Sequence, residues 1–266
     1  TSTTPVLDLC IDAYALSQIP HFSPHELKPH EDAVEHFTAE GESVVSLQVK
    51  TGAGCLHFAA GAGALGIARC LVRHRAAVNA VDAHGKSPIF WGVTHGHTEV
   101  CCFLLDKRAD PTLKSDQGNT ALHIAANGGH VGTLQLVLPY FRSPDVRGKS
   151  LRTPLHLAAA QGGLYLCEML LDRGADPGIV CSAGRTALHY AAGRGHLGVC
   201  RILTAVDTSI LFLRDALGLT ALDLCTQNAR LTPALSAVLA PPPRSPPWRR
   251  AAVAARPDSK PPSRPG

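Results

Sequence analysis

The sequence predicts an all-α protein, a solenoid in which two-helix units stack one on another. Three observations support this fold class. One motif occurs six times, at steps of 33 or 34 residues. Within each step the apolar residues lie three and four apart, as in Val199, Ile202 and Leu203, which is the spacing of one helix face. Hydrophobic residues make up 45% of the 266 residues but aromatic residues only 5%, which suits helix packing better than a β-sandwich.

The motif begins with Thr, Ser or Gly, and its fourth residue marks the repeat register. Thr153-Pro154 shows how a unit begins, because a capping hydroxyl precedes a proline at the first helical position. A Gly, often followed by His as in Gly129-His130, then separates the first helix from the second. One unit cannot bury its own apolar face, so neighbouring units must stack. The register residues, 33 or 34 apart, are His57, Phe90, His123, His156, His189 and Asp223.

The pattern Thr-Pro-Leu-His-x-Ala at residues 153–158 resembles the ankyrin repeat. The resemblance implies an ankyrin-repeat solenoid in which β-hairpin-like loops project as fingers and the first helices line a concave face. Repeat two departs from the pattern by reading Ser-Pro-Ile-Phe-Trp, and repeat six has Asp223 in place of His. Repeats three and five lack the usual Gly-Ala-Asp turn. The six predicted units cover about residues 51–84, 85–117, 118–150, 151–183, 184–217 and 218–240.

The two ends of the chain differ from the repeats in charge and composition. Residues 1–50 hold eight acidic and two basic residues, with helices predicted at Val6–Ser17 and Glu31–Glu40. This segment is either a degenerate capping repeat or an unfolded acidic arm that could lie over a basic groove. Residues 241–266 hold nine prolines and six bases, which predicts a disordered tail.

Motifs that suggest chemistry have simpler structural explanations. Gly61-x-Gly63-x-x-Gly66 matches a dinucleotide fingerprint, but it falls on a helix–helix turn with no preceding strand. Gly85-Lys86-Ser87 lacks the earlier glycine of a phosphate loop. The repeated histidines occupy equivalent places in successive units and do not converge, and the resemblance implies that they bond to backbone between repeats. We therefore expect no enzyme activity, no cofactor and no metal site.

The nine cysteines form no CxxC pair. Cys101, Cys167 and Cys200 share one register of the second helix, where cysteine behaves as a small buried apolar residue. An odd number of cysteines favours a reducing compartment, so we predict the cytoplasm first and the nucleus second. No apolar run reaches the roughly 18 residues that cross a bilayer, and we expect no membrane insertion.

The resemblance implies a protein partner bound at the finger tips and at the exposed side of the first helices. Repeats four and five contribute four bases and no acid to these positions, so they should attract an acidic or phosphorylated segment. Nucleic acid is not expected, because the bases lack interleaved aromatic residues. The predicted partner-binding residues are His84, Lys86, Thr94, His95, Asp116, Gln117, Asn119, Asn127, Lys149, Arg152, Gln161, Arg185 and Arg194.

Together these features predict a monomeric, non-catalytic scaffold or adaptor that binds a protein of unknown identity and no small-molecule substrate. The alternative is a substrate-recognition or regulatory module of a larger enzyme or of a ubiquitin-ligase assembly. Asn79 adds one modification hypothesis, because it resembles the ankyrin asparagines that a cytosolic asparaginyl hydroxylase modifies. The simpler interpretation is that Asn79 serves its turn.

Overall fold

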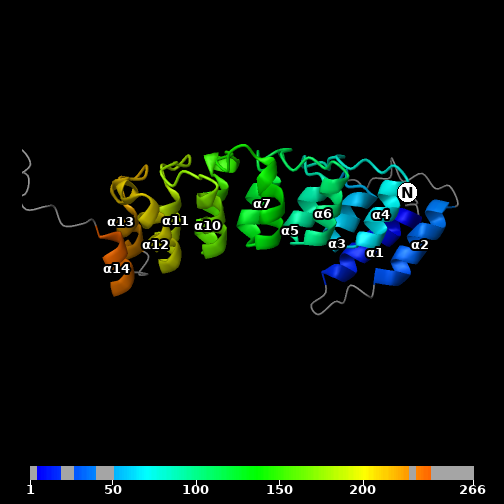
Figure 1. Cartoon of the computed structure of the whole chain (residues 1–266), viewed down its shortest axis with the longest axis horizontal. Coiled ribbons are helices and arrows are strands. Elements are labelled where there is room, and N and C mark those ends of the chain that lie inside the picture. The colour runs from blue at the N-terminus through cyan, green and yellow to red at the C-terminus, as the bar shows by residue number, and fades with distance from the viewer. Residues whose placement is uncertain (1–4, 19–26, 40–50, 228–231, 241–266) are drawn as a thin grey trace, which may run out of the picture.

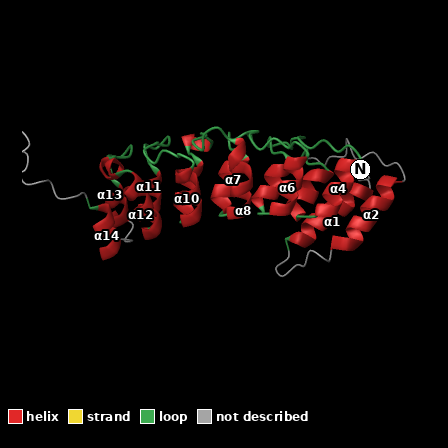
Figure 2. Ribbon diagram, in the orientation of Figure 1, coloured by secondary structure: helices red, strands yellow, loops and turns green. Residues whose placement is uncertain are grey.

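The computed structural model describes residues 5–18, 27–39, 51–227 and 232–240, and the regular structure in these ranges is helical. Helices stand in a row of pairs, and the loops that join successive pairs run along one edge of the row (Figure 2). The first helices are α1 (Pro5–Ser17), α3 (Cys55–Ala62), α5 (Pro88–Thr94), α7 (Ala121–Gly128), α9 (Pro154–Gln161), α11 (Ala187–Arg194) and α13 (Ala221–Gln227). The second helices are α2 (Lys28–Ala39), α4 (Leu65–Arg73), α6 (Thr98–Asp106), α8 (Val131–Val137), α10 (Leu164–Asp172), α12 (Leu197–Val206) and α14 (Pro233–Leu239). The predicted all-α solenoid is confirmed.

The helices form two layers, and each helix contacts the equivalent helix of the next pair. First helices touch in series from α1 to α13, and second helices touch in series from α2 to α14 (Figure 1). One register of the second layer is fully buried along the array and consists of Leu71, Leu104, Val137, Leu170 and Leu203. Burial of such a side chain stabilises the fold by about 2 kcal/mol. The core is therefore continuous, and each unit depends on its neighbours. None of the described helices is long and apolar enough to span a bilayer.

Helix α9 shows how the motif sets the bounds of a first helix. The Thr153 side chain accepts the backbone N–H of His156, and His156 Nδ1 accepts the backbone N–H of Thr153 at 3.1 Å. The helix ends at Gln161 and is capped by Gly162, which is left-handed at φ 74°, a conformation that glycine adopts without steric cost. A Cβ on Gly162 would lie 2.6 Å from the ring of His196. The glycine of one unit thus makes room for the histidine of the next.

Two sets of histidines bind neighbouring repeats to each other. His156 accepts at Nδ1, so its proton lies on Nε2, which donates to the Arg185 carbonyl at 2.9 Å. Histidines of the Gly-His pairs reach back instead, as His130 Nε2 does to the Thr94 carbonyl at 3.0 Å. The inter-repeat bonding that the resemblance implied is confirmed. Equivalent forward bonds join His57 to Lys86, His123 to Arg152 and His189 to Leu219.

The fingers are the loops between successive repeats, numbered by the repeat that each precedes. In finger two the Asp82 N–H donates to the Lys86 carbonyl at 2.9 Å, which closes a hairpin-like turn. Each finger also bonds to the one before it, as the Ser182 N–H does to the Ser150 carbonyl at 2.9 Å. The fingers therefore form a continuous row without a regular strand in the described residues. They are finger two (80–86), three (113–119), four (146–152), five (179–185) and six (213–219).

The acidic N-terminal segment contains two helices at the end of the row. Helix α1 contacts α3, and α2 contacts α4. Glu31 Oε1 accepts the N–H of Gly66 at 3.1 Å, and Tyr14 lies against the rings of Phe58 and Trp91. Both helices lie far from α9 and α11 (Figure 1), so they do not cover repeats four and five. The rest of this segment and the predicted tail at 241–266 lie outside the described residues.

Burial keeps the forward-bonding histidines uncharged. His123 and His156 are almost fully buried, and burial lowers the pKa of each to about 4. The pKa values of His57 and His189 are lowered for the same reason. A protonated imidazole would lose its Nδ1 acceptor and place a charge in the core. The bonds between repeats therefore require neutral histidine.

We predict that the array loses stability as the pH falls from about 6.5 towards 4. Unfolded histidine binds a proton near pH 6.5 whereas the folded residues resist until about pH 4, so acid favours the unfolded chain. The full loss is roughly 3 kcal/mol for each such histidine. Urea denaturation at several pH values measures it. His156→Phe, which copies Phe90 of repeat two, should be less stable at neutral pH but show a shallower pH dependence; equal dependence in both proteins would contradict the explanation.

Candidate functional site

Three hollows lie between the fingers and the exposed side of the first helices, and ten predicted partner-binding residues line them. The N-terminal hollow includes His84, Lys86, Asp116, Gln117 and Asn119. The central hollow includes Asn119, Asn127, Lys149 and Arg152. The C-terminal hollow includes Arg185 and Arg194. The predicted surface is thus a broken groove along repeats two to six.

Apolar side chains that are not among the predicted contact residues form the floor of this groove. Ile124, Leu157 and Tyr190 occupy one register at 33-residue steps, and each is half-buried. Each follows the register histidine directly in sequence. That position could have identified them, since a residue between a buried histidine and the open groove must be partly exposed. The groove therefore has polar finger residues above an apolar floor.

The remaining predicted contact residues lie outside the hollows. Thr94 is exposed, and its hydroxyl donates to the Phe90 carbonyl at 2.7 Å. His95 is half-buried, with Nε2 at 3.4 Å from the hydroxyl of Tyr14 in α1. Gln161 is exposed and donates to the side chain of Asn127 at 3.3 Å. His95 therefore belongs to the junction with the N-terminal helices.

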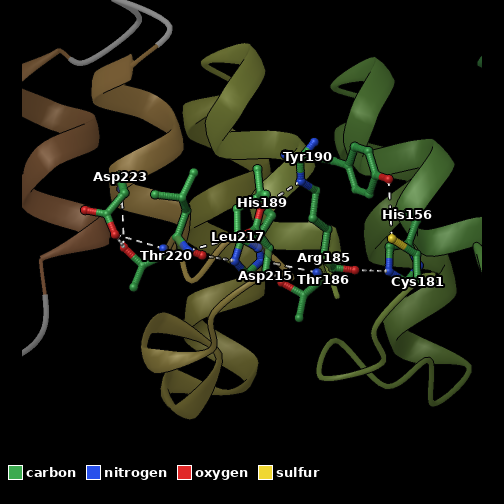
Figure 3. Close-up of polar contacts among 11 residues, drawn as sticks. His156, Cys181, Arg185, Thr186, His189, Tyr190, Asp215, Leu217, Thr220 and Asp223 are labelled. Carbon is green, nitrogen blue, oxygen red and sulfur yellow. Dashed lines mark hydrogen bonds and ion pairs between the residues drawn. The ribbon is translucent and has the colours of Figure 1, made fainter. Parts of the chain in front are cut away.

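Arg185 carries a charge that the protein already pairs. Its Nε lies 3.0 Å from Oδ2 of the buried Asp215 in finger six (Figure 3). Asp215 also accepts the backbone N–H groups of Leu217 and Leu219. Burial alone would raise the pKa of Asp215, but these donors and Arg185 outweigh it and lower that pKa. Asp215 is not one of the predicted contact residues. The count of four bases and no acid in repeats four and five therefore overstated the positive charge that is available to a partner.

The other bases of repeats four and five are placed differently. Lys149 and Arg152 are exposed on finger four and line the central hollow. The Arg152 guanidinium lies over the Tyr190 ring, 5.3 Å from its centroid. Arg194 Nη1 donates to the Ala160 carbonyl at 2.6 Å. The exposed positive charge therefore concentrates at finger four.

Finger two shows how a carboxylate holds a finger in shape. Asp82 Oδ1 accepts the backbone N–H groups of His84 at 2.8 Å and Lys86 at 2.9 Å, while Oδ2 accepts Trp91 Nε1–H at 3.1 Å. Burial opposes ionisation, yet the three donors lower the pKa of Asp82. This arrangement is a cage for an anion, formed by the turn itself.

In finger five a cysteine occupies the place of that carboxylate. Cys181 Sγ lies 3.4 Å from the Tyr190 hydroxyl (Figure 3), and the Arg152 guanidinium lies over the Tyr190 ring. Burial alone would raise the pKa of the thiol, but the Tyr190 hydroxyl, the N–H groups of Ala183 and Arg185, and the charge of Arg152 lower it. By contrast, the buried Cys101, Cys167 and Cys200 have pKa values raised to about 12 by burial, and their predicted place in the core is confirmed.

Asn79 serves the turn on which it lies. Its Nδ2 donates to the Arg108 carbonyl at 3.1 Å, and its Oδ1 accepts the N–H of Asp110 at 2.9 Å. Two repeats later Asp145 occupies the same register and accepts the N–H of Asp176 at 3.3 Å. A carboxylate has no donor for the equivalent carbonyl, and burial and the charge of Asp176 raise the pKa of Asp145. Hydroxylation of Asn79 stays a prediction.

The glycines that match a dinucleotide fingerprint lie on the turn between two helices and do not follow a strand. Gly61 lies near the end of α3, Gly63 caps that helix and Gly66 lies in α4. Within the described ranges, no three His, Cys, Asp or Glu side chains gather as metal ligands would. The glycines therefore serve the helix–helix turn.

Two-helix units, a row of fingers and a groove between them define a solenoid repeat protein with an extended contact surface. The family described as "Ankyrin repeats (3 copies)" matches residues 26–115, 108–181 and 155–239. The chain belongs to the ankyrin repeat family. Ankyrin repeats are in general modules of protein–protein interaction, and the fold is typically non-catalytic.

Solved structures of ankyrin domains resemble the chain over most of its length. The human ASB11 ankyrin repeat domain is 24% identical, with a TM-score of 0.71 over 86% of this chain and 99% of that one. The ankyrin repeat domain of Bcl-3, a unique member of the IkappaB protein family, is 25% identical, with a TM-score of 0.67 over 89% of this chain and 97% of that one. The ASB11 similarity shows the fold alone.

We predict that Cys181→Asp stabilises the array, because a carboxylate would accept the two N–H groups of finger five as Asp82 does in finger two. A gain of roughly 1 kcal/mol is expected from these charge-assisted bonds. Cys181→Ala, which removes the acceptor, should be less stable than the native protein. Thermal denaturation of the three proteins tests the order, and an aspartate variant less stable than the alanine variant would refute the cage.

We also predict that Asp145→Asn raises stability by roughly 1 kcal/mol, since the new amide supplies the missing donor and removes a charge near Asp176. The reverse change at the matched position, Asn79→Asp, should lower stability by a similar amount. Chemical denaturation at neutral pH measures both variants. Shifts in the same direction for both would contradict the equivalence of the two turns.

Proposed function

We propose that this protein is a non-catalytic adaptor that binds an acidic or phosphorylated segment of a partner protein at the groove of repeats four and five. The observation that carries this proposal is the pair of exposed bases on finger four, Lys149 and Arg152, which line a hollow that contains no acidic residue. Asn119 and Asn127 supply neutral hydrogen-bonding groups to the same hollow. The chemistry of the hollow therefore suits an anion with adjacent polar groups.

The placement of Arg152 supports recognition of a carboxylate or a phosphate. Its guanidinium rests on Tyr190, and such stacking restricts the side chain while its N–H groups remain able to donate. A planar guanidinium binds either anion through two parallel hydrogen bonds. Arg185 contributes less, because Asp215 already offsets its charge. We therefore place the centre of anion binding at finger four and α9.

The alternative function is that of a regulatory or substrate-recognition module of a larger enzyme or of a ubiquitin-ligase assembly. Residence in the cytoplasm or nucleus and a monomeric state also stay predictions. The larger assembly, the compartment and the oligomeric state do not bear on the proposed anion site, which depends only on residues of the groove.

We expect Lys149→Glu combined with Arg152→Glu to weaken binding of a fluorescent glutamate-rich peptide, and of the same peptide with phosphoserine, by at least about tenfold. Fluorescence anisotropy at low and moderate salt measures the change, and the native affinity should fall as salt increases. Arg185 is not changed, because a glutamate there would leave the buried Asp215 carboxylate without its cationic partner.

The matched control is Arg142→Glu combined with Arg201→Glu, which makes the same change in net charge at exposed residues that do not line the hollows. This control should bind the peptide nearly as well as the native protein. An equal loss in both double variants would mean that net charge alone attracts the peptide. No loss in the Lys149 and Arg152 variant would overturn the proposed site.

A further inference from the structure

Finger four differs from the other fingers at the residue that makes the turn. The equivalent residue is a left-handed glycine in fingers two, three, five and six, with φ between 69° and 77°. In finger four this residue is Leu151, which has a φ of 58°. The preceding residue, Ser150, is also left-handed at 58°. Two consecutive non-glycine residues thus adopt a conformation that L side chains rarely populate.

Burial does not compensate Leu151 for this conformation. Glycine would adopt the same φ without a clash between Cβ and the backbone. The leucine side chain is 46% exposed, so it gains little from the core. The Leu151 N–H donates to the Gly148 carbonyl at 3.0 Å, but the turn glycines of the other fingers make the same bond without a side chain. The turn therefore does not require leucine, and a strained, half-exposed residue is a reason to look for an external contact.

The hydrogen bonds that hold finger four also differ from those of the other fingers. Gly148 occupies the register where Asp82 and Asp215 cage their own turns. The Lys149 N–H donates to the Asn119 side-chain oxygen at 3.0 Å, where the other fingers bond to a backbone carbonyl of the preceding loop. These changes give finger four a turn of different shape from those beside it.

Leu151 lies between the two bases that carry the proposed function. Lys149 and Arg152 flank it in sequence, and both line the central hollow. An exposed aliphatic side chain between two cations offers a partner both dispersion contact and charge. Binding energy usually concentrates in a few residues that lose all their water at the centre of an interface, and burying an exposed aliphatic side chain there is favourable. A partner that fits this surface would therefore carry an apolar group as well as negative charge.

We propose that Leu151 is the apolar anchor of the partner-binding surface and that the bound segment carries an aliphatic or aromatic side chain next to its acidic or phosphorylated residues. The proposal rests on the proposed function, because Lys149 and Arg152 are taken to bind the acidic groups. The strain at Leu151 predicts that native binding and native stability respond to this residue in opposite directions.

The test uses the full chain and a bead library of short synthetic peptides in which glutamate and phosphoserine alternate with randomised positions. The native protein should enrich Leu, Ile, Met or Phe at a randomised position next to the acidic residues. Leu151→Gly should lose that enrichment and bind the selected peptide about tenfold more weakly, since an aliphatic contact is removed. The same variant should unfold at a higher urea concentration than the native protein, because the strain is relieved.

Gly118→Leu is the matched control, because it places leucine at the same register of finger three. A Cβ on Gly118 meets nothing closer than 3.9 Å, so the variant tests only the cost of the left-handed conformation. This variant should unfold at a lower urea concentration and keep the native peptide preference. A rise in its stability would show that leucine is not strained at this register and would remove the structural basis of the proposal.

The outcomes separate the anchor from the proposed function. If the native protein selects acidic peptides without apolar enrichment, or if Leu151→Gly keeps that enrichment, the anchor is wrong and the anion site stands. If the native protein selects no acidic peptide, the proposed function fails and the anchor fails with it.

Discussion

The structure depends on a buried, uncharged imidazole that joins repeats one, three, four and five each to the finger that follows. In repeat four, His156 caps its own helix through Nδ1 and reaches the Arg185 carbonyl through Nε2. One side chain thereby fixes a helix start and the position of the following loop. Repeat two shows what happens without it, since Phe90 replaces the histidine and the Ser87 hydroxyl is buried with no hydrogen-bond partner among the described residues. The array tolerates one such loss because its neighbours are intact.

Because the histidines and helices hold the frame, the finger residues can differ from repeat to repeat. The repeats of this chain differ most from one another in their fingers. Finger two has a caged carboxylate, finger five a cysteine in the same cage, and finger four a glycine there with Leu151 at the turn. The helices beneath them are nearly the same. Under the proposed function, specificity for a partner would reside in these few side chains on a generic scaffold, in keeping with the general separation of fold from function.

The repeat units were predictable from sequence because each signal is local: a Thr-Pro start, a histidine three residues later, and a glycine that ends the helix. The candidate site was less predictable, since its electrostatics depend on pairs far apart in sequence. The selected contact positions contain Arg185 but not Asp215, which neutralises it across the next finger. Leu151 was missed because exposure and backbone conformation matter more there than residue type. Comparison of the turn glycines in all fingers would have revealed it.

The tautomer of the four forward-bonding histidines tests the central claim most directly. Long-range proton–nitrogen NMR of the imidazole rings distinguishes a neutral ring protonated at Nε2 from the other tautomer and from imidazolium. His57, His123, His156 and His189 should each be neutral with the proton on Nε2 at neutral pH, and His123 and His156 should remain so near pH 5.5. Rings protonated at Nδ1, or charged rings at neutral pH, would contradict this account.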